Sequence, residues 1–240
     1  MILLSLDFET TGLDKEKDRI TEVGAVLWST NFNRAMETTS YFVDAGVPIP
    51  KEITELTGIN AAMLKKFGYS ENDAMDLLID MAEQADAYVG QNVIQFDKIF
   101  FENTTYRLGK PVPEKLWIDT RTDLPGVESK SLSYMACDAG FLNPFPHNAV
   151  ADCLTVLRLV SKFPIEDIVA RAKQPNVVVQ GLQDRDHNDD AKKLKFLWKP
   201  EFKMWLKVVK EGDVKSLAEA APFNISIQTK MTPDQVWYSK

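Results

Sequence analysis

The first strand-like segment of the sequence ends in two carboxylates. Asp7 and Glu9 close the run Ile2-Leu3-Leu4-Ser5-Leu6-Asp7-Phe8-Glu9. Alternate residues of a β-strand share a face, so the two acids are expected side by side, opposite the apolar residues of the run. Neighbouring carboxylates in a low-dielectric site repel, and a divalent cation such as Mg²⁺ or Mn²⁺ removes that conflict. The alternative is a strand end that exposes both acids to water.

Two later segments supply further groups of the same chemistry. Asp97 ends the segment Val89-Gly90-Gln91-Asn92-Val93-Ile94-Gln95-Phe96-Asp97 near an expected helix start, where the helix dipole favours a carboxylate. Asp152 lies in the first turns of an apolar helix that Asn148 is suited to cap. His147 precedes that cap on an expected loop. A plain dipole-favoured acid and a loop histidine without a function are the alternatives.

Together, these three segments resemble the motifs of the DEDDh exonucleases, the DnaQ-like family of 3′→5′ exonucleases that includes proofreading subunits. The motifs read DFETTG, GQNVIQFD and HNAVADC, in the family's order within residues 1–165. The stretch ITELTGIN is similar to the segment that the family places between its first two motifs. Gln91 departs from the pattern, in which a histidine is commoner, without affecting a metal ligand.

The resemblance implies a ribonuclease-H-like fold and a site for two Mg²⁺ or Mn²⁺ ions. Asp7 would bridge both ions, and Glu9 and Asp152 would complete the site of the ion that holds the attacking water. Asp97 would serve the other ion. His147 would be the general base, because a histidine with a pKa near neutrality suits proton removal from water.

The resemblance also implies that the turn after the first strand receives the 3′ end of a single strand. Backbone amides of the turn would bond the terminal hydroxyl, and Leu13 would lie against the last base. Plain core packing is the alternative for Leu13. The implied substrate contacts in this part of the chain are Thr10, Thr11, Gly12, Leu13, Asn92 and Phe96.

The composition is that of an ordinary soluble globular protein, with 240 residues, 45% hydrophobic and 26% charged. No apolar run reaches the ~18 residues of a membrane span, and the first residues carry no signal-peptide pattern. No membrane partner is therefore expected. Cys137 and Cys153 form no metal or disulfide pattern, so a reducing, cytoplasmic setting is the default expectation.

Charge is distributed unevenly along the chain. Residues 171–240 hold 13 Lys and Arg against 9 Asp and Glu, a net charge of +4, whereas residues 1–170 carry a net charge of −11. The polar stretch Gln174-Pro175-Asn176 is a plausible boundary. We therefore expect an exonuclease domain over residues 1–174 and a small basic α+β domain over residues 175–240.

The order of elements favours an α/β fold. Three β-rich runs at 2–12, 20–28 and 35–43 have short connections and predict an antiparallel meander. Short apolar strands at 87–90 and 116–120 alternate with helices and predict parallel additions. The expected fold is a ribonuclease-H-like mixed sheet of five strands, three antiparallel and then parallel ones, flanked by helices. Helices are expected at 53–56, 61–66, 70–81, 95–108, 131–138, 149–163 and 165–173.

The stretch 192–210 interleaves seven lysines with four aromatic residues. It predicts a hairpin that turns at Lys199-Pro200-Glu201, with Phe196 and Trp198 on one face. Lysines suit phosphates and rings suit bases, so Trp198 and Trp205 are candidate contacts with a single strand. Docking of another protein and simple structural support are the alternatives, because a small domain also needs aromatic residues for its core.

The predicted function is a metal-dependent 3′→5′ exonuclease that releases nucleoside 5′-monophosphates from the 3′ ends of single-stranded DNA. An RNA-trimming exoribonuclease and a non-catalytic polymerase-docking subunit are the alternatives. The preference for DNA rests on analogy, namely the additional basic domain and the length of the chain. A polymerase, or another replication or repair protein, is the candidate protein partner.

Overall fold

The computed structural model describes residues 1–127 and 131–237. The chain divides into two compact units, Met1–Ala172 and Lys173–Lys240, close to the expected boundary after residue 174. Among the described residues, no helix has both the length and the apolar character that a bilayer crossing requires.

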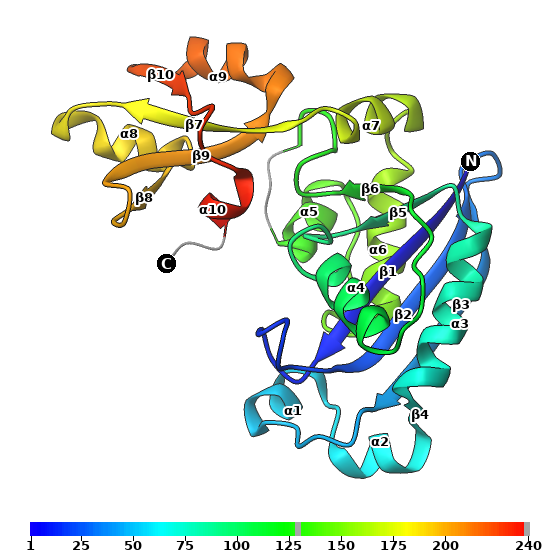
Figure 1. Cartoon of the computed structure of the whole chain (residues 1–240). Coiled ribbons are helices and arrows are strands. Elements are labelled where there is room, and N and C mark those ends of the chain that lie inside the picture. Colours follow the sequence, from blue (N-terminus) through cyan, green and yellow to red (C-terminus); the bar gives the residue numbers. More distant parts are fainter. Residues whose placement is uncertain (128–130, 238–240) are drawn as a thin grey trace. The chain divides into compact units, whose positions relative to one another are not determined.

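The larger unit is built on a six-stranded sheet with the order β4-β3-β2-β1-β5-β6 (Figure 1). The first three strands are antiparallel, and β5 and β6 follow β1 in parallel, which confirms the predicted mixed sheet. The sequence did not indicate β4, because two residues are too few for a periodic pattern. The strands are β1 (Ile2–Thr10), β2 (Ile20–Ser29), β3 (Arg34–Asp44), β4 (Tyr69–Ser70), β5 (Ala87–Gly90) and β6 (Leu116–Asp119).

Helices cover both faces of this sheet (Figure 1). On one face Leu4, Leu6 and Phe8 pack with buried residues of α3 and α4. On the other face Leu3 packs with residues of α5, α6 and α7, and Ser5 Oγ donates to the Cys153 carbonyl at 3.4 Å. The alternation of β1 therefore directs Asp7 and Glu9 toward the α6 side. The helices are α1 (Lys51–Thr57), α2 (Ala61–Phe67), α3 (Glu71–Gln84), α4 (Asp97–Arg107), α5 (Leu132–Asp138), α6 (Ala149–Val160) and α7 (Ile165–Ala172).

Gly24 lets the first turn of α6 lie directly against the sheet. This residue is the β2 partner of Asp7. A Cβ at Gly24 would stand 2.3 Å from the Ala149 carbonyl carbon and 2.5 Å from the Val150 nitrogen. Backbone atoms cannot give way as a flexible side chain does, so only glycine permits this approach. The start of the helix that carries Asp152 is thereby brought beside Asp7.

The smaller unit is a four-stranded antiparallel sheet with the order β10-β7-β9-β8. The predicted hairpin corresponds to β8 and β9. Two small apolar clusters form its core, one around Val178 and Leu206 and the other around Val179 and Phe196. The elements are β7 (Asn176–Leu182), η1 (Arg185–His187), α8 (Asn188–Lys193), β8 (Leu197–Lys199), β9 (Met204–Lys210), η2 (Glu211–Asp213), α9 (Val214–Ala220), β10 (Asn224–Ile227) and α10 (Pro233–Trp237).

We predict that Gly24→Ala destabilises the larger unit by about 3 kcal/mol, because the added methyl group forces α6 away from β2. The matched control is Gly46→Ala, at a turn with a φ of +68° and no atom near the added methyl group, which should cost roughly 1 kcal/mol from backbone strain alone. Denaturant unfolding of both variants measures the difference. Equal costs would show that the close approach is not needed.

Candidate active site

Three acids from two distant parts of the chain meet at the end of β1. Asp7 and Glu9 lie on β1, and Asp152 lies in the first turn of α6. Each offers one carboxylate oxygen, and these oxygens all lie within 4.8 Å of one another. Such an all-oxygen donor set fits a hard divalent cation such as Mg²⁺ or Mn²⁺.

Asp97 is held on the buried side of the same site. It begins α4, is 3% exposed, and accepts a hydrogen bond on Oδ1 from the Phe8 backbone N–H at 2.9 Å. Because Phe8 lies between Asp7 and Glu9, this bond joins the second motif to the first. Asp97 and the other three acids line one cavity of about 270 Å³.

His147 lies at the rim of this cavity. Asn148 caps α6 by accepting the Ala151 N–H at 3.2 Å, and His147 precedes the cap with a φ of +62°. The His147 backbone N–H donates to Asp152 Oδ2 at 3.2 Å, while Asn143 Nδ2 donates to the other carboxylate oxygen. The loop thus orients Asp152, and the His147 side chain stays exposed to solvent.

Burial and mutual repulsion raise the pKa values of these acids. Burial is the main cause that raises the pKa of Asp7, and the charges of Asp97, Asp152 and Glu9 add to it. Burial, followed by the charge of Glu22, raises the pKa of Glu9 to about 7. Burial also raises the pKa of Asp97 and of Asp152. No lysine or arginine among the described residues forms an ion pair with these four acids, and a bound divalent cation would supply compensating charge.

The predicted substrate contacts of the larger unit divide into two groups. Thr10, Leu13, Asn92 and Phe96 line the cavity, and Leu13 is 80% exposed, which excludes core packing for it. Thr11 and Gly12 instead face Asp18, because Thr11 Oγ1 donates to Asp18 Oδ1 at 2.9 Å and a Cβ on Gly12 would meet the same carboxylate. Thr11 and Gly12 therefore contact the loop between β1 and β2, and they are not among the described residues that line the cavity.

Sequence reasoning missed the apolar wall that α1 contributes. Ile53, Leu56 and Thr57 line the cavity together with Leu13, and Leu56 is 54% exposed. The similarity of the ITELTGIN stretch pointed to this segment but assigned it no role. Exposed apolar side chains beside a cluster of acids suit the flat face of a nucleobase.

Glu22 was also missed, because nothing in the sequence distinguishes an acid within an apolar strand. It is 3% exposed and pairs with Glu9 across β1 and β2. Its Oε1 accepts hydrogen bonds from Ser40 Oγ at 2.8 Å and from Asn148 Nδ2 at 3.4 Å. Glu22 thereby ties the cap of α6 to the sheet.

The end of β6 holds the turn between β5 and α4. Asp119, which is 2% exposed, accepts hydrogen bonds from the backbone N–H groups of Asn92 and Arg121, both at 2.9 Å. Thr120 Oγ1 donates to the Gly90 carbonyl at 3.1 Å. Asn92 needs this support because its φ is +59°. The hydrogen bonds of Asp119 and Thr120 fix the turn so that Asn92 lines the cavity, as does Asp97 five residues later.

The fold and this acidic site define a class of nuclease. Residues 4–160 match the RNase_T family, described as exonuclease, and this match covers more than half of the chain. The chain belongs to that family. The predicted membership in the DEDDh (DnaQ-like) class of 3′→5′ exonucleases is confirmed at the level of family and fold.

Two of the relatives that the chain matches are bacterial DNA polymerases of the PolC type. The chain is 34% identical over 114 residues to DNA polymerase III PolC-type of Caldanaerobacter subterraneus, and this region covers 48% of the chain and 8% of the polymerase. It is 28% identical over 155 residues to the PolC-type polymerase of Clostridium perfringens, which covers 61% of the chain and 10% of that protein. The chain thus spans about a tenth or less of these relatives.

Solved structures show the same fold. E. coli exonuclease I in complex with a dA16 oligonucleotide superposes with a TM-score of 0.62 at 13% identity, covering 93% of this chain and 64% of that one. The nuclease domain of 3′hExo, a DEDDh family member bound to rAMP, gives a TM-score of 0.57 at 17% identity, covering 67% of this chain and 90% of that one.

We predict that the metal-free protein loses stability as the pH rises from about 4.5 to about 7. Glu9 keeps its proton longer in the folded state, because its pKa is raised from 4.5 to about 7, so folding is favoured below this window and penalised above it. Glu9→Gln should remove its share and stabilise the metal-free protein at pH 8 by about 2 kcal/mol. Denaturant unfolding in chelator measures this, with Glu37→Gln, on exposed β3, as the control. An unchanged pH slope in Glu9→Gln would contradict the prediction.

Proposed function

We propose that this chain is a metal-dependent 3′→5′ exonuclease that releases nucleoside 5′-monophosphates from the 3′ ends of single-stranded DNA. The observation that carries the proposal is the convergence of Asp7, Glu9 and Asp152, with oxygens within 4.8 Å of one another, in one cavity that Asp97 and His147 also line. We include a reducing, cytoplasmic setting in this proposal.

The residues present fit two divalent cations. Asp7, Glu9 and Asp152 would hold them, with Asp97 contributing from the buried side, and two such ions supply stabilisation of the attacking and leaving oxygens in a phosphodiester displacement. The His147 imidazole would take the proton from the attacking water. A loop position suits that task, because the side chain can approach once a strand is bound.

The apolar walls of the cavity would select an unpaired 3′ end. Leu13 from the turn after β1 and Leu56 from α1 can contact a terminal base, while backbone amides of the turn can bond the 3′-hydroxyl. A paired terminal base already stacks within its duplex, so this mode of binding favours single strands.

The preference for DNA over RNA is supported by the ligands bound in structures with the same fold. E. coli exonuclease I has been solved with dA16 and other DNA oligonucleotides, which favours DNA. 3′hExo has been solved with rAMP, which keeps RNA trimming as the second candidate. The similarity to PolC-type polymerases makes a polymerase a candidate partner. A non-catalytic docking role has less support, because all four acids and the histidine are present.

We predict that Asp7→Ala and Asp152→Ala each abolish Mg²⁺-dependent release of mononucleotides without unfolding the protein. Each removes an oxygen donor that holds a cation, and metal assistance is worth several kcal/mol of barrier. The assay uses 5′-labelled single-stranded DNA and RNA of matched sequence, with Mg²⁺ and then with chelator, and circular dichroism checks the fold. Wild-type turnover in either folded variant would refute the assignment.

His147→Ala should lower turnover by about 10²- to 10⁴-fold, the range for loss of a general base, while Mn²⁺ binding stays close to that of the wild type. Calorimetric titration with Mn²⁺ separates the two effects. Added imidazole should restore part of the rate in His147→Ala and none in Asp7→Ala. Loss of Mn²⁺ binding in His147→Ala would instead make this histidine a metal ligand.

A further inference from the structure

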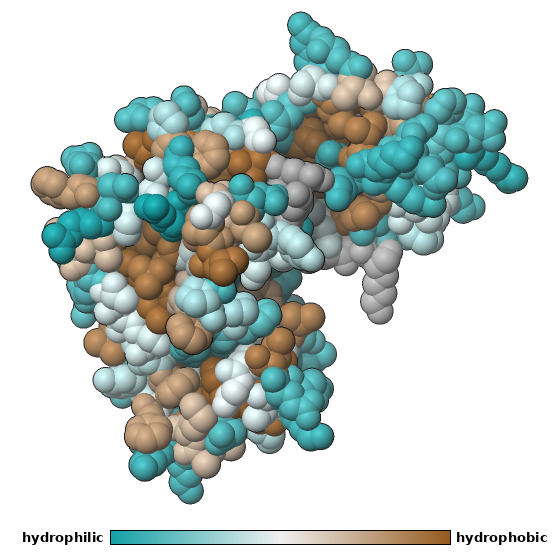
Figure 2. Space-filling model, turned by 180° about the vertical axis from the view of Figure 1, so that it is seen from behind, coloured by the Kyte–Doolittle hydropathy of each residue, from teal (hydrophilic) through white to brown (hydrophobic). Residues whose placement is uncertain are grey.

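The smaller unit contains a cavity of about 770 Å³ at one end of its sheet. It is bounded by the end of β7, the segment through η1, and the β8–β9 hairpin. Figure 2 shows hydrophobic residues reaching the surface of this unit among hydrophilic ones. The lining combines aromatic, cationic and polar side chains, and its main members are Gln183, Asp184, Arg185, Trp198, Lys203 and Trp205.

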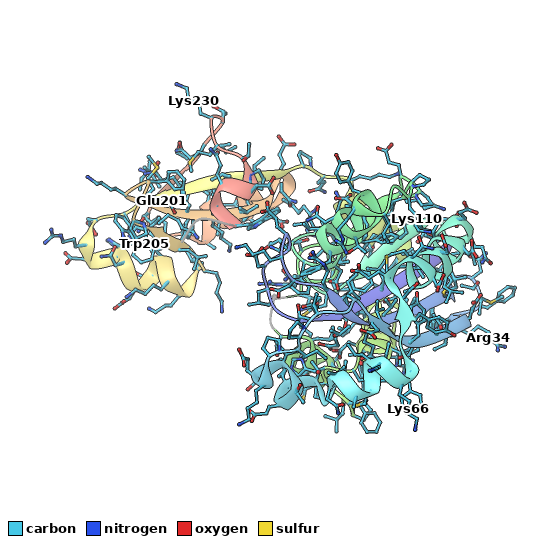
Figure 3. All side chains as sticks on the ribbon, turned by 60° about the horizontal axis from the view of Figure 1, so that its bottom comes forward. Arg34, Lys66, Lys110, Glu201, Trp205 and Lys230 are labelled. Carbon is cyan, nitrogen blue, oxygen red and sulfur yellow. The ribbon has the colours of Figure 1, made fainter. Side chains whose placement is uncertain are left out.

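Two tryptophans form one wall of this cavity. Trp198 and Trp205 are directly opposite each other in the β8–β9 register, with ring centroids 5.9 Å apart and planes inclined by 55°. Trp205, labelled in Figure 3, has its Nε1 3.0 Å from the end of the Gln183 side-chain amide, and it donates to the amide oxygen when that amide is oriented so that its nitrogen donates to the Gly181 carbonyl. Trp198 is 47% exposed, whereas Phe196, two residues earlier, is 1% exposed and belongs to the core. The Trp205 indole therefore packs against the core of the smaller unit, whereas the Trp198 indole is accessible to a ligand.

Several of the seven lysines in residues 192–210 are buried or form hydrogen bonds or ion pairs within the protein. Lys207 Nζ donates to the Leu194 carbonyl at 2.8 Å, and Lys210 is only 3% exposed. Lys192 and Lys193 form ion pairs with acids of the same helix at 2.9 and 3.0 Å. The expectation that lysines of this stretch contact phosphates stays a prediction, and Lys203 is the lysine of the stretch that lines the cavity.

Among the described residues, two cationic side chains and one acid line the cavity. Arg185 and Lys203 line it and are both exposed. The acid of the lining, Asp184, accepts a hydrogen bond from His187 Nδ1 at 2.7 Å, and this bond raises the pKa of His187 and lowers that of Asp184. The lining thus places Arg185 and Lys203 beside the exposed indole of Trp198, and Asp184 is engaged by His187.

We propose that this cavity, called here the tryptophan site, binds an unstacked nucleobase and the adjoining phosphate of single-stranded nucleic acid, away from the 3′ end held at the active site. Trp198 would stack on the base, and Arg185 and Lys203 would contact the phosphate. The identity of the ligand as part of the substrate rests on the proposed function. An acidic peptide of another protein could use the same cations, but only a nucleic acid supplies an aromatic base next to a phosphate in every unit, so we favour the nucleic acid.

The site has a kinetic consequence. A strand long enough to reach both sites binds the second one intramolecularly, so its overall affinity exceeds that of a strand that reaches the active site alone. Stacking on one ring is worth a factor of roughly 10 in affinity. The tryptophan site should therefore lower the KM for long strands and leave kcat unchanged.

The binding test uses the full chain in chelator, where turnover cannot interfere, and a 5′-fluorescein oligothymidylate of about 30 nucleotides. Trp198→Ala should weaken binding about 10-fold, and Trp198→Phe, which keeps a ring, should recover most of the loss. The matched control is Ile227→Ala. Ile227 is 46% exposed on β10, at the opposite edge of the same sheet, and its removal should change nothing. Equal affinity in Trp198→Ala and the wild type, for DNA and for RNA, would overturn the proposal in favour of a protein partner.

The turnover test separates this proposal from the exonuclease assignment. With Mg²⁺, Trp198→Ala should raise the KM for the long strand about 10-fold while kcat, and all parameters for an oligonucleotide of about 4 nucleotides, stay at wild-type values. An unchanged KM, or an equal loss on both substrates, would overturn the tryptophan site. A wild-type chain that releases no mononucleotide from either strand, but binds the long strand through Trp198, would overturn the exonuclease assignment alone.

Discussion

Repulsion among clustered, partly buried carboxylates is the constraint that the larger unit must satisfy. Asp7, Glu9 and Asp152 lie together, Asp97 adds a further negative charge at Asp7, and no cation of the described chain compensates them. Separate acids would move apart or become protonated. They stay together because each one is attached to a different rigid element or strand position, so the sheet and its helices bear the repulsion until a divalent cation neutralises it.

Contacts between β1, β2, α4 and α6 fix the positions of the four acids. β1 is flanked by β2 and β5, which prevents Asp7 from shifting along its strand. Gly24 admits the backbone of α6 beside Asp7, and Glu22 holds the Asn148 cap of that helix. The Phe8 N–H restrains Asp97 from the other side. These contacts join segments that are distant in the sequence, so the site depends on tertiary packing more than on any one segment.

Local patterns in the sequence predicted much of the site, whereas features that depend on neighbours distant in the chain were missed. Strand alternation was enough to put Asp7 and Glu9 on one face, and the motif order identified Asp97, His147 and Asp152. Glu22 and Asp119 are acids whose partners come from other strands and loops, so no local pattern marks them. The lysines of residues 192–210 differ among themselves for a related reason, because the burial of Lys210 and the local pairing of Lys192 and Lys193 depend on neighbours that a periodic pattern does not encode.

The two units present opposite charges to a polyanion. Residues 1–172 hold 16 Lys and Arg against 26 Asp and Glu, a net charge of −10, and residues 173–240 hold 12 against 9, a net charge of +3. At physiological ionic strength fields decay over about 8 Å, so the acidic surface of the larger unit opposes a strand only at short range. Attraction to nucleic acid must therefore arise locally, from cations bound among the four acids and from groups such as Arg185 and Lys203 in the smaller unit. A division of this kind lets the larger unit keep a site tuned to divalent metals, because general affinity for the strand is supplied elsewhere.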